Sequence, residues 1–101
     1  MKPVFLRFTD SNGEVTKTFT TCSLKTGTLD NILDIAERAE ELKGANITEI
    51  RAFYKDLKAI IADVFKGQFT FDELNENVEQ EELEKVFKDL CSRISGEMQK
   101  N

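Results

Sequence analysis

The feature that most constrains this chain is a sharp break between two apolar helical segments within residues 63–74. Gly67 follows the first segment and can take the left-handed conformation that ends a helix. Thr70 and Glu73 have the three-residue spacing of a capping box, which begins the next helix. Three phenylalanines surround this corner: Phe65, Phe69 and Phe71. Rings at this density either anchor a core or form an apolar surface, and both interpretations are open at this point.

Size and charge restrict the class of protein. The chain has 101 residues, of which 40% are hydrophobic, and a chain of this size buries roughly 60–65% of its unfolded surface. We therefore expect a single domain over residues 1–101. Lys and Arg number 14 against 19 Asp and Glu, a net charge of −5, which opposes non-specific binding to nucleic acid or anionic lipid. Neither a nucleic acid nor a membrane is expected as a partner.

The amino-terminal residues contain no apolar run long enough for a secretion signal or a membrane span, so we expect a cytosolic protein. Cys22 and Cys91 lie far apart, and the chain has no histidine with which they could bind a metal or form a nucleophile–base pair. Free cysteines commonly pack as small apolar residues, so we expect buried or half-buried thiols. A Cys22–Cys91 disulfide is an alternative, although the cytosol would keep it reduced.

A β-hairpin is predicted over about residues 3–22. Val4, Leu6 and Phe8 alternate with other residues, and a threonine-rich run follows a turn signal at Asn12-Gly13. Two strands alone are marginally stable in water. Helices must therefore cover one face of the hairpin, or strands of another chain must extend it.

Helical periodicity predicts three to four helices after the hairpin, over about residues 28–43, 46–66, 70–77 and 80–97. Thr28 is the candidate N-cap of the first helix. Asn46 with Glu49 is that of the second, predicted to be the longest and most central. The predicted fold class is α+β, mainly α. An acidic stripe on the first helix is expected to face solvent: Asp30, Asp34, Glu37 and Glu41.

The second helix carries opposite charges on the two edges of its apolar stripe. Its basic edge contains Arg51, Lys55 and Lys58, and its acidic edge contains Glu49, Asp56 and Asp63. This arrangement suits a helix that lies between two neighbours. The neighbours are either other helices of the same domain or helices of another copy.

The sequence contains no phosphate-binding loop, nucleophile elbow, clustered metal ligands or calcium-loop pattern. A small chain without such motifs would have to catalyse with surface acids alone. We therefore predict a non-enzymatic protein without cofactor or metal.

The order of elements resembles that of the tail assembly chaperones of long-tailed phages of Gram-positive bacteria. The most specific part is the run from Val64 to Leu74, Val-Phe-Lys-Gly-Gln-Phe-Thr-Phe-Asp-Glu-Leu, which is similar to the FGxQFTxDEL joint of that family. The sequence departs from this pattern in having Lys66 before the glycine.

The resemblance implies a function in bacteriophage tail morphogenesis. Such a chaperone binds the tape measure protein, keeps it soluble, and helps recruit tail tube subunits, the last through a longer form made by translational frameshifting. It also implies a protein of the infected host's cytoplasm that is absent from the mature virion. Self-association into an oligomer would let weak single contacts along the partner add up.

Apolar residues near the joint and in the last helix are the candidate partner-binding residues. They form the two walls of a hypothetical groove: Phe65, Phe69, Phe71 and Leu74 on one side, and Phe87, Ile94 and Met98 on the other. Large apolar residues in a small domain are also needed inside it, so a core role is the competing interpretation.

Two other functions are compatible with the sequence. One is a small acidic phage or bacterial inhibitor or regulator that docks on a host protein through the acidic stripe of the first helix. The other is a virion subunit such as a small connector, which the lack of long loops disfavours.

Overall fold

The computed structural model describes residues 3–21 and 24–99, with side chains described as far as Ile94. Two strands come first, β1 (Val4–Thr9) and β2 (Val15–Thr21), and they form an antiparallel hairpin. Four helices follow: α1 (Thr26–Glu40), α2 (Ile47–Val64), α3 (Phe71–Asn77) and α4 (Gln80–Gln99). The predicted class, α+β and mainly α, is confirmed.

The hairpin turns where the sequence predicts. Gly13 has a φ of +80°, which a glycine adopts at little cost. The Asp10 carboxylate accepts hydrogen bonds from the backbone N–H groups of Asn12 and Glu14, at 2.9 and 3.0 Å. Phe8 pairs with Lys17 but Thr9 pairs with Val15, so Thr16 forms a β-bulge beside the turn.

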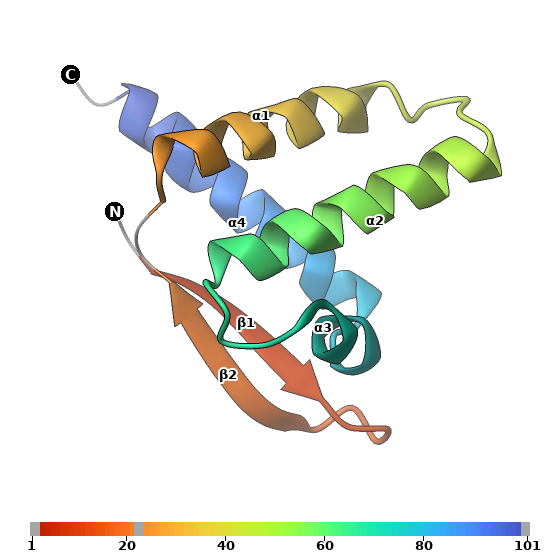
Figure 1. Ribbon diagram of the computed structural model, residues 1–101, viewed down its shortest axis with the longest axis vertical. Helices are drawn as coiled ribbons and strands as arrows, with labels where there is room; N and C mark the ends of the chain where they lie inside the picture. Colours follow the sequence, from red (N-terminus) through yellow and green to blue (C-terminus); the bar gives the residue numbers. More distant parts are fainter. Residues whose placement is uncertain (1–2, 22–23, 100–101) are drawn as a thin grey trace.

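One face of the hairpin contributes to the core. Val4, Leu6 and Phe8 are buried, whereas the intervening Phe5 and Arg7 are exposed. In Figure 1, α1 and α2 form an antiparallel pair, and α4 crosses behind them. One end of α4 lies near α3 and the hairpin, and the other lies near the start of α1. Helices of the same chain therefore cover the inner face of the hairpin.

The two charged edges of α2 face two different helices of the same chain. On the acidic edge, Arg38 of α1 pairs with Asp56, with 2.8 Å between Nη1 and Oδ2. On the basic edge, Lys58 donates a 2.7 Å hydrogen bond to Asn75 of α3. Of the two interpretations from sequence, these contacts support the one in which α2 lies between helices of its own domain.

The beginning of α1 differs from the prediction. The helix starts at Thr26, with Lys25 as an N-cap that makes no side-chain hydrogen bond. Thr28 is therefore not the cap, because its hydroxyl donates to the Asp63 carboxylate of α2 at 3.5 Å. The Thr28 side chain, which the sequence pattern assigned to capping α1, therefore makes a contact between α1 and α2 instead.

The second helix begins as predicted, because the Asn46 side chain accepts a 2.8 Å hydrogen bond from the Glu49 N–H. The prediction that this helix is the longest is wrong, since α2 has 18 residues and α4 has 20. Continuous apolar spacing lets α4 run on towards Gln99, whereas the Gly67 corner stops α2.

The corner between α2 and α3 has both predicted devices. Thr70 accepts from the Glu73 N–H at 3.1 Å, and the Glu73 carboxylate accepts from the Thr70 N–H at 2.9 Å. Gly67 has a φ of +75°. Lys66 has a φ of +50°, the one positive φ at a non-glycine position among the described residues. A left-handed conformation costs a residue with a Cβ roughly 1–2 kcal/mol.

Candidate partner-binding surface

The structure places the seven predicted partner-binding residues in different environments. Phe65 is 0% exposed and Phe69 is 5% exposed, and Leu74 and Ile94 are also buried. Phe71 and Phe87 are half-buried, and the Met98 side chain lies outside the described residues. Four of the seven are therefore core residues in this conformation and are not accessible to a partner.

The rings at the corner pack against the hairpin. The Phe69 ring centroid lies 5.5 Å from that of Phe65, 5.4 Å from that of Phe8 and 5.0 Å from that of Phe19. Phe8 and Phe19 are themselves in edge-to-face contact at 4.6 Å. We call these four residues the aromatic corner. Such pairs stabilise a core beyond their buried area, so the corner holds the two-stranded sheet against the helices.

Phe71 and Phe87 are the two predicted residues with partial exposure. Phe71 is the first residue of α3, and Lys58 of α2 places its ammonium 5.9 Å from the centre of the Phe71 ring. Phe87 packs against the edge of the core from α4. These two side chains expose parts of their rings.

The far end of the α1–α2 pair has an apolar surface that sequence reasoning missed. We use this name for the end that carries the connection over residues 41–46, which points away from the hairpin and α4 in Figure 1. Ile47, the first residue of α2, is 78% exposed there. An isoleucine at that level of exposure gains little from burial, so its side chain is free to contact a partner.

An open cleft of about 190 Å³ lies between the two helices at the same end. Its lining combines an apolar floor with a charged rim: Arg38, Glu41, Leu42, Glu49, Ala52 and Phe53. Arg38 is held by its ion pair with Asp56 and lies 5.9 Å from the centre of the Phe53 ring. A floor and rim of this kind suit an apolar side chain presented by a polar partner surface.

Tyr54 of α2 contacts α4 through its hydroxyl group. The Tyr54 hydroxyl lies 3.4 Å from the Glu84 carboxylate of α4. Burial raises the pKa of Tyr54 above its usual 10.0, and the negative charge of Glu84 raises that pKa further. The amino-terminal end of α2, which begins at Ile47, extends beyond α4 in Figure 1.

Cys91 of α4 is half-buried, as predicted, and burial raises the pKa of its thiol. Cys22 lies outside the described residues, so the predicted alternative of a Cys22–Cys91 disulfide is outside them too. Among the side chains that the structure describes, no group of three or more His, Cys, Asp or Glu residues could hold a metal ion.

All four acidic residues of the α1 stripe are exposed, as predicted: Asp30, Asp34, Glu37 and Glu41. Their helix also exposes Leu33, at 44%.

Along the described parts of the chain, none of the helices is both long and apolar enough to cross a membrane.

The sequence contained a weak signal for the far end. Ile47 directly follows the Asn46 cap, and the first turn of a helix is where a packed apolar stripe often has not yet begun. Ile47 also fits the regular apolar stripe of α2, and the stripe by itself does not reveal where its cover ends.

No curated protein and no solved structure matches the chain. The profile of a protein family described as phage tail chaperone protein matches it over residues 1–101. That range includes the hairpin, the corner with its capping box, and all four helices described above. The chain therefore belongs to the phage tail chaperone protein family.

Proposed function

We propose that this chain binds the tape measure protein of its phage and keeps it soluble until tail tube subunits assemble around it. The observation that carries the proposal is the family match over residues 1–101. A tail chaperone implies tail proteins as partners in general. The resemblance to tail assembly chaperones implies the tape measure protein as that partner, and a long helical protein with unpaired apolar surface aggregates.

The far end of the α1–α2 pair is the proposed contact surface. It combines an exposed Ile47 with a cleft whose floor contains Leu42 and Phe53. An amphipathic partner helix would insert apolar side chains there, and the charged rim would face its polar flanks. Each contact of this size is weak, so we propose that several copies act together along one partner.

We further propose that the protein is non-enzymatic and requires no cofactor. It is proposed to work in the cytoplasm of the infected host without becoming part of the mature virion. A carboxyl-extended form is proposed to recruit the tail tube protein.

Coexpression tests the proposal. The tape measure protein of the same phage is expressed with and without the chain, its soluble fraction is measured, and the chain is then used as bait in a pull-down. We expect a larger soluble fraction and recovery of a complex. An insoluble, unbound tape measure protein in the presence of the folded chain would refute the proposal.

Variants at the far end test the surface. Ile47→Asp and Ala52→Glu both change exposed positions, and at Ile47, in the first turn of α2, an acidic residue is favoured by the helix dipole. We therefore expect both variants to fold and to rescue the tape measure protein less well. Leu33→Asp is the matched control, because Leu33 is an apolar residue of α1 that is 44% exposed and does not line the cleft, and this change should leave rescue unchanged.

The same assay distinguishes the acidic inhibitor. Asp34→Lys with Glu37→Lys reverses charge on the solvent face of α1 and should be harmless to a tape measure chaperone. Loss of binding in that variant, together with binding that disappears at high salt, would favour docking through charge.

A further inference from the structure

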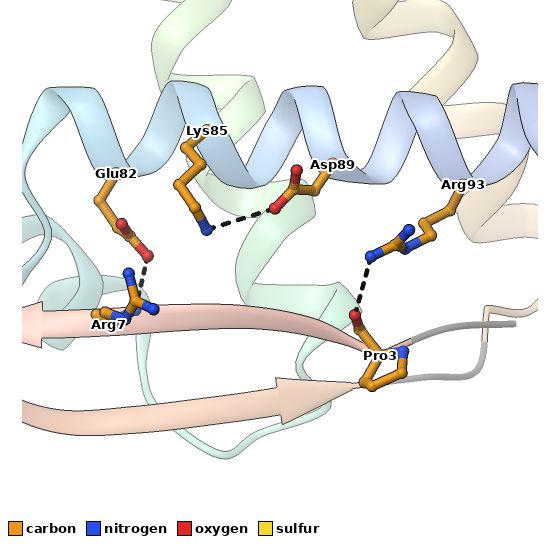
Figure 2. Close-up of polar contacts among 6 residues, drawn as sticks. All are labelled: Pro3, Arg7, Glu82, Lys85, Asp89 and Arg93. Carbon is orange, nitrogen blue, oxygen red and sulfur yellow. Dashed lines mark hydrogen bonds and ion pairs between the residues drawn. The ribbon is translucent and has the colours of Figure 1, made fainter.

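The two strands of the hairpin differ at their outer edges. Along β1, α4 supplies hydrogen-bond partners to the backbone, as Figure 2 shows. The Glu82 carboxylate accepts from the Arg7 N–H at 2.9 Å, and Arg93 donates to the Pro3 carbonyl at 3.4 Å. The edge of β1 is therefore closed to any further strand.

The register of the hairpin shows which backbone groups of β2 point away from β1. Because the Arg7 N–H points to α4, the facing pair Arg7 and Thr18 is one that exchanges no backbone hydrogen bonds. Thr18 and Thr20 thus direct their N–H and C=O groups away from β1. A separate contact agrees, since the Gln68 side chain donates a 2.9 Å hydrogen bond to the Thr20 carbonyl from outside the hairpin.

The stretch of β2 around Thr18 and Thr20 has few of the features that usually protect an edge strand from pairing with another strand. The bulge at Thr16 disturbs pairing only next to the turn, and Lys17 is the single charged residue of the strand. Thr18 and Thr20 are exposed and uncharged. An edge without proline, inward charge or covering helix is a template for strand addition.

We propose that two copies of the chain pair through β2, antiparallel about a two-fold axis near Thr18–Thr20, to form a continuous four-stranded sheet. A strand edge is satisfied by an extended partner and not by a helix. In a second copy the β1 edge is closed by α4, so the matching edge is β2 itself. Threonines meet threonines at this interface, and two chains of net charge −5 bring no carboxylates together there. The Thr20 carbonyl has a second lone pair and can keep Gln68.

This pairing specifies the self-association included in the proposed function, but its test uses the chain alone. Its failure therefore leaves the tape measure proposal standing. The mass of the purified chain is measured by light scattering during gel filtration over a concentration series. We expect a dimer of about twice 11.5 kDa, with slow hydrogen exchange at the Thr18 and Thr20 amides.

Thr18→Pro is the main variant. It removes an N–H that β1 does not use, and proline is tolerated at strand edges, so we expect a folded monomer. Thr20→Lys is the second variant, because it charges the edge while facing Phe5 across the hairpin, and it should weaken the dimer as well. Thr18→Val keeps both the edge and the β-propensity and should remain dimeric.

Three results would overturn the pairing. They are a monomer at the highest attainable concentration of the unmodified chain, a dimer that survives in folded Thr20→Lys protein, and an oligomer whose Thr18 and Thr20 amides exchange as fast as those of a monomer.

Discussion

Two apolar regions of this phage tail chaperone differ in what covers them. At the aromatic corner, Phe69 touches rings from the hairpin and the ring of Phe65, the C-cap of α2, and is 5% exposed. At the far end of the α1–α2 pair, Ile47 belongs to the apolar stripe of α2 and is 78% exposed. Both regions contain large apolar side chains, and the presence of a neighbouring element against them decides which are buried.

In the proposed function, this difference separates stability from binding. The corner joins the sheet to the helices, so its side chains are already used within the chain. The far end extends past α4 and keeps apolar surface available. A chaperone for an aggregation-prone partner requires both, because the exposed surface is useful only on a fold that does not depend on it.

The largest expected effect is at the corner. Phe69→Ala should lower the free energy of unfolding by about 3–5 kcal/mol, because it removes a buried ring and leaves a cavity between hairpin and helices. Urea unfolding measures the change. Phe5→Ala, on the exposed face of β1, is the control and should cost far less. Similar losses in the two variants would contradict a core role for the corner.

The capping box should contribute less. Thr70→Ala removes the acceptor for the Glu73 N–H and should destabilise the protein by about 1 kcal/mol. Thermal or urea unfolding would detect it. Thr70→Ser retains the hydroxyl and should recover most of the loss. A neutral Thr70→Ala would mean that packing alone holds the turn at the corner.

A still smaller effect is expected at Tyr54, whose hydroxyl contacts Glu84 of α4. Its pKa is raised in the folded protein, so the folded state favours the neutral phenol. The resulting stability is present below the ordinary pKa of 10.0 and is lost as pH rises through the folded-state pKa. Unfolding free energies measured from about pH 9 to 11 should fall more steeply for the unmodified protein than for Tyr54→Phe. Parallel curves would show that α4 does not enclose this hydroxyl.

The smallest change in stability is expected at the far end. Ile47→Asp should alter the free energy of unfolding by no more than about 0.5 kcal/mol, because it changes an exposed position. Its rescue of the tape measure protein should nevertheless fall. A large loss of stability would show that Ile47 belongs to the core and would remove the distinction between the two regions.

Local signals predicted much of the fold. The turn at Asn12-Gly13, the Asn46 cap and the capping box at Thr70 all form as the sequence indicates. Each depends on residues within a few positions of one another, whose geometry is nearly independent of the rest of the chain. Thr28 is the instructive exception, since a hydroxyl that suits a cap bonds Asp63 on another helix instead.

The candidate site was harder to predict. Leucines and phenylalanines at helical spacing look the same whether a neighbour covers them or not, so the predicted groove residues Phe65, Phe69, Leu74 and Ile94 are found in the core. The far end and the open edge of β2 depend on where α4 lies, and that position comes from packing between elements distant in the sequence.

The sequence by itself determined the elements of this protein: a hairpin, four amphipathic helices and a sharp corner, because turns, caps and periodicity are local properties. Its resemblance to phage tail chaperones likewise came from the run around Gly67. Only the tertiary structure decided which apolar side chains are enclosed and which strand edge stays open. Both depend on the crossing of α4 behind the α1–α2 pair and along β1, since burial is a relation between surfaces that no single segment contains.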